Sequence, residues 1–162
     1  MEPNRRENST HLESIRYSRG NLKVLDQLCV PQELVYCELT SVSDGIHAIK
    51  TMQVRGAPLI AIVGCLSLGV HLNSMESSAF HDSAEFLTFL EKNIQDLIDA
   101  RPTAVNMRRE GHRLIQFAKE LARNNESVEN LRLRFTLWHF LYHWRENISL
   151  CNVQTIAHAQ TL

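Results

Sequence analysis

The sequence predicts an α+β fold, in which a small N-terminal antiparallel β-meander is followed by an α-helical bundle. Short β-rich runs separated by Gly and Pro occupy residues 14–40, which is typical of a meander. From residue 41 onward the apolar residues recur at helical spacing. The run from Leu59 to Val70 is apolar nearly all round, as expected for a buried central helix. We therefore expect one domain over residues 14–131, with the meander at 14–40 and helices at 41–131.

Turn signals delimit the strands of the predicted meander. A Gly-containing turn separates IRYS (15–18) from LKVLDQ (22–27), and a break at Val30-Pro31 precedes ELVYCELT (33–40). Gly and Pro at these positions end one extended run and allow the chain to reverse. Three antiparallel strands are the simplest arrangement of these runs.

The first two helices are predicted from their end signals. Ser41 followed by Asp44 resembles a capping box, so a helix should begin there. Gly56 is the residue type best suited to a left-handed C-cap, so this helix should end at Gly56. Pro58 has no N–H to leave unpaired and favours the first turn of the next helix.

Two further helices follow the apolar run. Apolar residues form one stripe between about Ser83 and Asp99, which indicates an amphipathic helix. The last helix follows Arg101-Pro102-Thr103, where Thr103 is the expected N-cap.

The two ends of the chain differ from this domain. Residues 1–13 are polar, so we expect them to be disordered. Residues 132–162 include a cluster of aromatic residues but follow no single hydrophobic period. We expect this segment to be a divergent, poorly structured tail.

Composition limits the classes of partner. The chain of 162 residues carries 17 basic and 18 acidic side chains, a formal charge of −1, and this balance does not favour non-specific binding to nucleic acid or membranes. The four cysteines form no CxxC pair, so neither a zinc site nor a disulfide framework is indicated. The N-terminus lacks the apolar segment of a secretory signal. We expect a cytoplasmic protein with neither nucleic acid nor membrane as partner.

The segment VRGAP has two interpretations. Gly56 lets a ligand approach the backbone, the N–H of Ala57 is free to donate at a helix start, and Arg55 adds a charged fork suited to phosphate. Alternatively, the segment is a corner between helices with Arg55 in solvent. Arg101 also precedes a helix start, so it is either a second phosphate ligand that converges with Arg55 or a charged connector.

Other reactive side chains give weaker indications. His139 and His143 have helical spacing, but no acidic residue or cysteine nearby completes a metal site. Cys65 lies in the apolar run and is expected to be a small buried hydrophobic residue. We therefore predict no metal site.

Three separated segments resemble one known family. IRYSRGNLKVLDQ, AIKTMQVRGAPLIAIVGCLSLGV and ARPTAVNM occur in this order and are similar to the N-terminal domain of the methylthioribose-1-phosphate isomerase family. That family belongs to a superfamily that also contains regulatory subunits of translation initiation factor 2B. The resemblance extends from about Leu12 to about Arg132.

The resemblance implies a function. Members isomerise 5-methylthioribose 1-phosphate to 5-methylthioribulose 1-phosphate, in L-methionine salvage from methylthioadenosine, without a cofactor. It implies that Arg55, Gly56, Ala57 and Arg101 bind the phosphate of this phosphorylated thiosugar. It also suggests a homodimer and a location in the cytoplasm and the nucleus.

The chain departs from the family in its catalytic residues. The family's cysteine and aspartate lie in HCNTG-like and GADR-like motifs of a second, Rossmann-like domain, and neither motif occurs here; Cys151-Asn152 is only a two-residue echo. We therefore expect no catalytic residue in this chain, no Rossmann-like domain, and a truncated product that is inactive alone. The alternative is a non-catalytic isoform that pairs with the full-length enzyme, or an initiation factor 2B-like regulatory protein.

Overall fold

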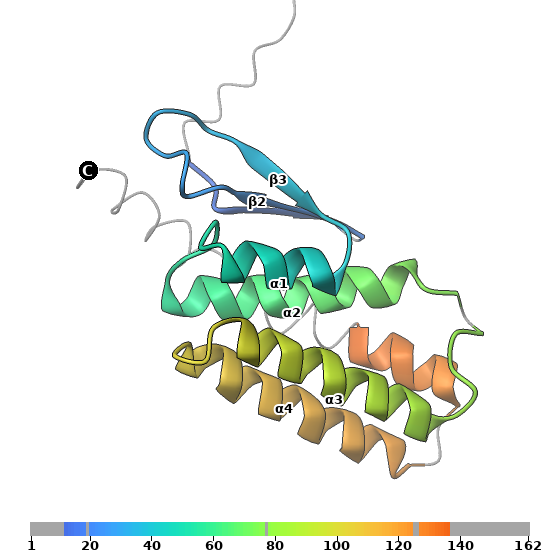
Figure 1. Cartoon of the computed structure of the whole chain (residues 1–162). Helices are drawn as coiled ribbons and strands as arrows, with labels where there is room; N and C mark the ends of the chain where they lie inside the picture. Colours follow the sequence, from blue (N-terminus) through green and yellow to red (C-terminus); the bar gives the residue numbers. More distant parts are fainter. Residues whose placement is uncertain (1–11, 19, 77, 125–126, 137–162) are drawn as a thin grey trace, which may run out of the picture.

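The structure, a computed structural model, describes residues 12–18, 20–76, 78–124 and 127–136. Within these ranges a three-stranded antiparallel sheet is followed by four α-helices and a helical segment at 128–136 (Figure 1). The predicted α+β class, a meander followed by helices, is confirmed.

The sheet is a simple meander. β1 (Ile15–Ser18), β2 (Asn21–Leu25) and β3 (Tyr36–Leu39) pair in sequence order. Leu22 lies opposite Leu39 in the register, and both side chains are buried. Because side chains alternate along a strand, this face of the sheet turns its apolar residues toward the helices.

The helices form two layers beneath the sheet. α1 (Val42–Lys50) and α2 (Ala57–Ser74) pack against the sheet, and α3 (Ser83–Ala100) and α4 (Val105–Ala122) lie on their far side (Figure 1). α2 contacts both α1 and α4, which places it at the centre of the helical layers.

The central helix α2 is buried on all sides. Every residue from Leu59 to Val70 is buried, as the apolar run predicts. By length and composition α2 could cross a membrane, but 72% of it is buried inside the protein. Its apolar character is therefore explained by its position in the core.

Glycines set the distance between α4 and its neighbours. A Cβ at Gly64 of α2 would lie 2.7 Å from Met107 Sδ, and one at Gly111 of α4 would lie 2.7 Å from Ile94 Cγ2. Both distances are too short for real carbon contacts. The absence of a side chain at these two positions therefore lets the helices approach closely.

The predicted end of the first helix is wrong, although its start is confirmed. Ser41 and Asp44 form the predicted capping box. The helix ends at Lys50, however, because the Met52 N–H donates three residues back, to the Ile49 carbonyl, and Met52 has a φ of 66°. Gly56 is the N-cap of α2, with Pro58 in the first turn as predicted.

Thr103 is not the N-cap of the last helix. A turn intervenes, in which the Ala104 N–H donates to the Arg101 carbonyl at 2.9 Å and the Val105 N–H donates to the Thr103 carbonyl at 3.0 Å. The helix therefore begins after Ala104, which has no side-chain cap.

Residues 132–136, which the sequence predicts to lie in the tail, continue the helical segment at 128–136. Leu131 and Phe135 are buried, and the Phe135 ring lies edge-on to Phe86 with centroids 6.1 Å apart. The predictions for residues 1–11 and 137–162, including His139, His143 and Cys151, lie outside the described residues.

Candidate functional site

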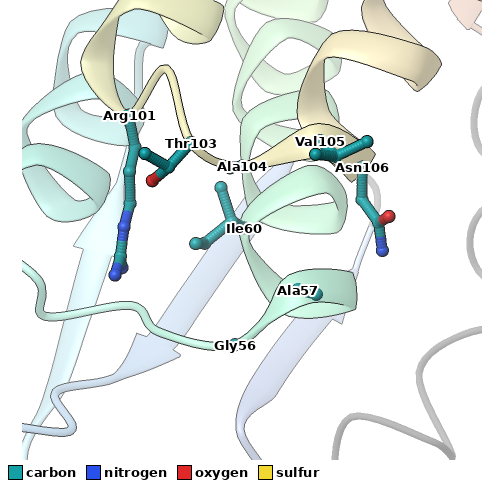
Figure 2. Close-up of a pocket in the computed structure, with 8 residues that line it drawn as sticks. All are labelled: Gly56, Ala57, Ile60, Arg101, Thr103, Ala104, Val105 and Asn106. Carbon is teal, nitrogen blue, oxygen red and sulfur yellow. The ribbon is translucent and has the colours of Figure 1, made fainter.

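A pocket of about 280 Å³ lies where the starts of α2 and α4 meet. From the start of α2 it is lined by Gly56, Ala57 and Ile60 (Figure 2). The other side is formed by the segment that leads into α4, and its lining residues are Arg101, Thr103, Ala104, Val105 and Asn106. Two helix N-termini and one arginine therefore share a single pocket.

Backbone N–H groups at the helix starts are donors that this pocket offers to an anion. The first residues of a helix have no intrahelical acceptor for their N–H groups, and these groups carry the positive end of the helix dipole. In α2 the first intrahelical hydrogen bond runs from the Ile60 N–H to the Gly56 carbonyl at 3.1 Å. Ala57 precedes it and faces the pocket, so its N–H is available to an anion.

The two helix starts at the pocket lack acidic groups. Neither α2 nor α4 has a side-chain cap or an acidic residue in its first turn. α1 and α3 have both, with Ser41 and Asp44 at α1 and Asp82 and Glu85 at α3. The positive ends of α2 and α4 are therefore not neutralised by nearby carboxylates.

Arg101 supplies the positive side chain of the pocket. It is half-buried, and its side chain extends from the end of α3 toward the loop at Gly56 (Figure 2). One terminal nitrogen, NH1, is buried without a hydrogen-bond partner among the described residues. A buried donor of this kind is costly unless an acceptor is supplied.

Arg55 is oriented differently. Its NH2 donates to the Gln27 carbonyl at 2.8 Å, and it is not among the residues that line the pocket. Its Nε is buried without a partner among the described residues. The structure thus places Gly56, Ala57 and Arg101 together, with Arg55 next to them but tied to the loop after β2.

Gly56 leaves the approach to the pocket open. Its φ of 99° and ψ of 141° lie in a region that residues other than glycine rarely adopt. A Cβ at this position would meet nothing within 4 Å. Glycine is therefore required by the backbone conformation rather than by a neighbouring atom.

Sequence reasoning missed several lining residues, among them Thr103, Val105 and Asn106. Thr103 was assigned to capping, but the structure leaves its hydroxyl at the pocket (Figure 2). The helix start expected after Pro102 could have indicated these residues. Residues on either side of a helix N-terminus lie next to its free N–H groups.

The lining residues include no carboxylate, imidazole or thiol. Cys65 is fully buried in α2, and burial together with the nearby Glu110 carboxylate raises the pKa of its thiol. It is therefore an inert core residue, as predicted. Nor do the described residues contain a cluster of three or more potential metal ligands.

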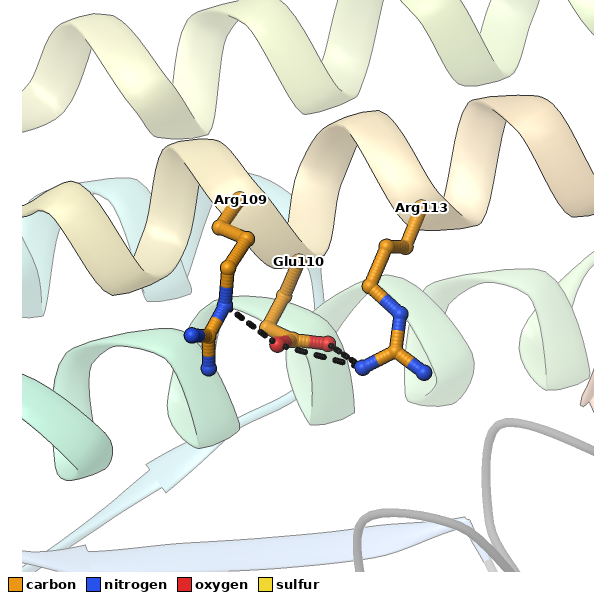
Figure 3. A network of polar contacts seen from close by, with 3 residues as sticks. All are labelled: Arg109, Glu110 and Arg113. Carbon is orange, nitrogen blue, oxygen red and sulfur yellow. Dashed lines mark hydrogen bonds and ion pairs between the residues drawn. The ribbon is translucent and has the colours of Figure 1, made fainter.

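A charged cluster on α4 lies outside the pocket lining. The Glu110 carboxylate, with a side chain 10% exposed, is 3.2 Å from Arg113 NH1 and 3.3 Å from Arg109 Nε (Figure 3). Paired arginines on both sides offset the cost of burying this carboxylate. We assign the cluster to the structure of α4 rather than to the pocket.

The matched family agrees with the sequence resemblance. A sequence model described as "Initiation factor 2 subunit family" matches residues 53–159. The chain belongs to this family. The match includes both helix starts of the pocket, and it continues beyond the boundary predicted at residue 132.

Relatives of this chain include named isomerases. The chain is 43% identical over 125 residues to methylthioribose-1-phosphate isomerases of Drosophila persimilis and Drosophila pseudoobscura pseudoobscura. The match covers 76% of this chain and 34% of each relative. The chain thus spans about a third of the length of these relatives.

Two solved structures share the fold. The 5-methylthioribose 1-phosphate isomerase of Pyrococcus horikoshii OT3 superposes with a TM-score of 0.69 at 24% identity, covering 79% of this chain and 35% of that one. Subunit delta of translation initiation factor eIF-2B from A. fulgidus gives a TM-score of 0.61 at 32% identity, covering 79% and 36%. The fold is therefore shared with one structure named as an isomerase and with one named as an initiation factor subunit.

Proposed function

We propose that this chain contributes the phosphate-binding part of a methylthioribose-1-phosphate isomerase site. The observation that carries the proposal is the pocket itself, where two acid-free helix N-termini meet the buried, unpartnered NH1 of Arg101. A phosphate dianion would accept from this guanidinium and from the amides at both helix starts. The identity to named isomerases supports 5-methylthioribose 1-phosphate as the ligand.

Binding of inorganic phosphate by the chain, measured by isothermal titration calorimetry, tests the pocket directly. We expect Arg101→Ala to weaken phosphate binding about 10- to 100-fold, since a charge-assisted hydrogen bond contributes about 1.5–3 kcal/mol. Arg123→Ala, at the opposite end of α4, serves as the matched control and should leave binding unchanged. Equal affinity of the wild type and Arg101→Ala would contradict the proposal.

We further propose that this chain alone has little or no isomerase activity. Moving a proton between sugar carbons requires an acid or base within hydrogen-bond reach, and the pocket lining supplies none. A coupled assay with 5-methylthioribose 1-phosphate should give no turnover above background at enzyme concentrations sufficient for phosphate binding. Turnover that disappears in Arg101→Ala would show that this view is wrong.

A non-catalytic, regulatory role is the second candidate. It is favoured by the 32% identity to an initiation factor 2B delta subunit and by the lack of acid–base groups in the pocket lining. Such a protein would act by pairing with a second copy, with a full-length isomerase or with an initiation factor subunit. Pull-downs with each purified partner distinguish these cases, and preferential capture of the initiation factor subunit would favour the regulatory role.

A further inference from the structure

Two buried polar residues at the end of β2 hold the segment between α1 and α2. Asp26 and Gln27 are 7% and 8% exposed, and neither lines the pocket. Polar residues are rarely buried to this extent unless they are hydrogen-bonded. Their partners lie 27 and 28 residues further along the chain, in the segment that leads to Gly56.

Three hydrogen bonds join these segments. Gln53 Nε2 donates to Asp26 Oδ2 at 2.8 Å. The Gln27 N–H donates to the Gln53 carbonyl at 2.9 Å. Arg55 NH2 donates to the Gln27 carbonyl at 2.8 Å. Gln53 and Arg55 are thus both tied to the adjacent residues Asp26 and Gln27.

The Asp26 carboxylate is itself fixed. Its second oxygen, Oδ1, accepts from the Leu28 N–H at 2.9 Å. The backbone N–H of Asp26 donates to the Val35 carbonyl at 2.8 Å. A carboxylate held by its own loop is a rigid acceptor for the Gln53 amide. The loop after β2 therefore acts as the fixed side of the contact.

The segment that makes these bonds is otherwise held by α1, where the Met52 N–H donates to the Ile49 carbonyl and the Val54 N–H donates to the Ala48 carbonyl, both at 3.2 Å. It lies outside regular secondary structure, and both Met52 and Gly56 have positive φ angles. Val54 is its buried apolar anchor. A positive φ at a residue other than glycine, such as Met52, persists only where surrounding contacts hold it in place, and the bonds to Asp26 and Gln27 are the contacts that fix this segment, and with it the start of α2, to the loop after β2.

We propose that Asp26 and Gln53 are positioning residues, which hold Arg55 and the Gly56 corner in the arrangement that binds an anion at the start of α2. The inference rests on the proposed function, because the anion is the phosphate of that proposal. Without the bond between Gln53 and Asp26, the segment that carries Arg55 and Gly56 regains freedom that phosphate binding at the start of α2 must then remove.

Exchanging the carboxylate of Asp26 and the amide of Gln53 tests this role. Gln53→Glu places a carboxylate against Asp26, so we expect about tenfold weaker binding of inorganic phosphate. It should also shift the Arg55 Nε–H resonance in ¹⁵N NMR spectra. The double variant Asp26→Asn with Gln53→Glu restores one amide and one carboxylate in exchanged positions. It should recover both the affinity and the resonance.

Gln95→Glu is the matched control. Gln95 donates to Asp99 at 2.9 Å on the exposed surface of α3, so this variant creates the same like-charge pair away from the pocket and should change neither readout. Gln53→Ala, which creates no repulsion, provides a second variant if Gln53→Glu does not fold. Thermal unfolding of each variant separates loss of binding from loss of structure.

The outcomes are distinct. An unchanged Arg55 resonance in Gln53→Glu or Gln53→Ala overturns the inference, as does a double variant that recovers neither readout. A shifted resonance with wild-type phosphate affinity also overturns it. Wild-type protein that binds no phosphate overturns the proposed function instead, and the Arg55 resonance then decides by itself whether Asp26 and Gln53 position this side chain.

Discussion

The helices α1 to α4 begin in two different ways. α1 and α3 each start with a side-chain cap and an acidic residue in the first turn, provided by Ser41 and Asp44 and by Asp82 and Glu85. α2 and α4 start at Gly56 and Ala104, with neither device. Only the second pair faces the pocket.

This difference separates stability from binding. A cap stabilises a helix because it satisfies N–H groups and neutralises the dipole. Those same N–H groups are what an anion needs. Helices that leave them free give up local stability and retain a binding surface, so the absence of a cap at α2 and α4 supports the proposed phosphate site.

Gly56→Ala should have the largest effect on stability. A non-glycine residue at a φ of 99° costs about 1–3 kcal/mol, and chemical denaturation should show a loss of this size. Phosphate binding should weaken as well, since the start of α2 must shift. Gly20→Ala is the control: at a φ of 82° it is strained too, but it lies in the hairpin turn and should leave phosphate affinity intact.

Ala104→Asp should convert α4 to the capped type. We expect stability to rise by about 0.5–1 kcal/mol, because the carboxylate caps the helix and complements its dipole. Phosphate affinity should fall about tenfold, because the new charge lies in the pocket lining. If stability and phosphate affinity both rise or both fall, the proposed difference between capped and uncapped helix starts is wrong.

Asp82→Ala should give the reverse pattern at α3. Asp82 Oδ1 accepts from the Glu85 N–H at 2.8 Å, and removal of such a cap costs about 1 kcal/mol. Denaturation should show this loss, while calorimetry with inorganic phosphate should show wild-type affinity. Reduced affinity in this variant would indicate that capped starts also contribute to binding.

The smallest effect concerns pH. Partial burial of Asp44 raises its pKa, but hydrogen bonds from Thr40 and Ser41 outweigh this and keep the pKa below its usual value. Its contribution is therefore fully present above about pH 4 and is lost as pH falls through the lower, folded-state pKa. Stability measured between pH 7 and pH 2 should fall less steeply in Asp44→Asn than in the wild type.

Local signals made much of the fold predictable. The capping box at Ser41 and Asp44 and the apolar run of α2 depend on residues close in sequence. The sequence marks Gly56 as a helix end but not which end, because glycine is favoured both after a helix and at an N-cap. Leu131 and Phe135 were missed, since two apolar residues one turn apart define no clear period.

The candidate site was predictable only in part. Arg55 and Arg101 occupy equivalent places in the sequence, each just before a helix start, and both were expected to converge on one phosphate. The structure distinguishes them, because the acceptor for Arg55 is the carbonyl of Gln27, 28 residues away. The direction of a long side chain depends on such distant partners, which neither periodicity nor a short motif records.

The close contact of Gly64 with Met107 has a consequence for the size of ligand that the pocket admits. It lies within α2 and α4, away from the pocket lining, yet it fixes how far apart the two helix starts stand. The aperture available to an anion is thus determined by core packing. Relatives that keep every lining residue but carry a larger side chain at this position would have a wider aperture, and their selectivity would differ without any change on the surface that touches the ligand.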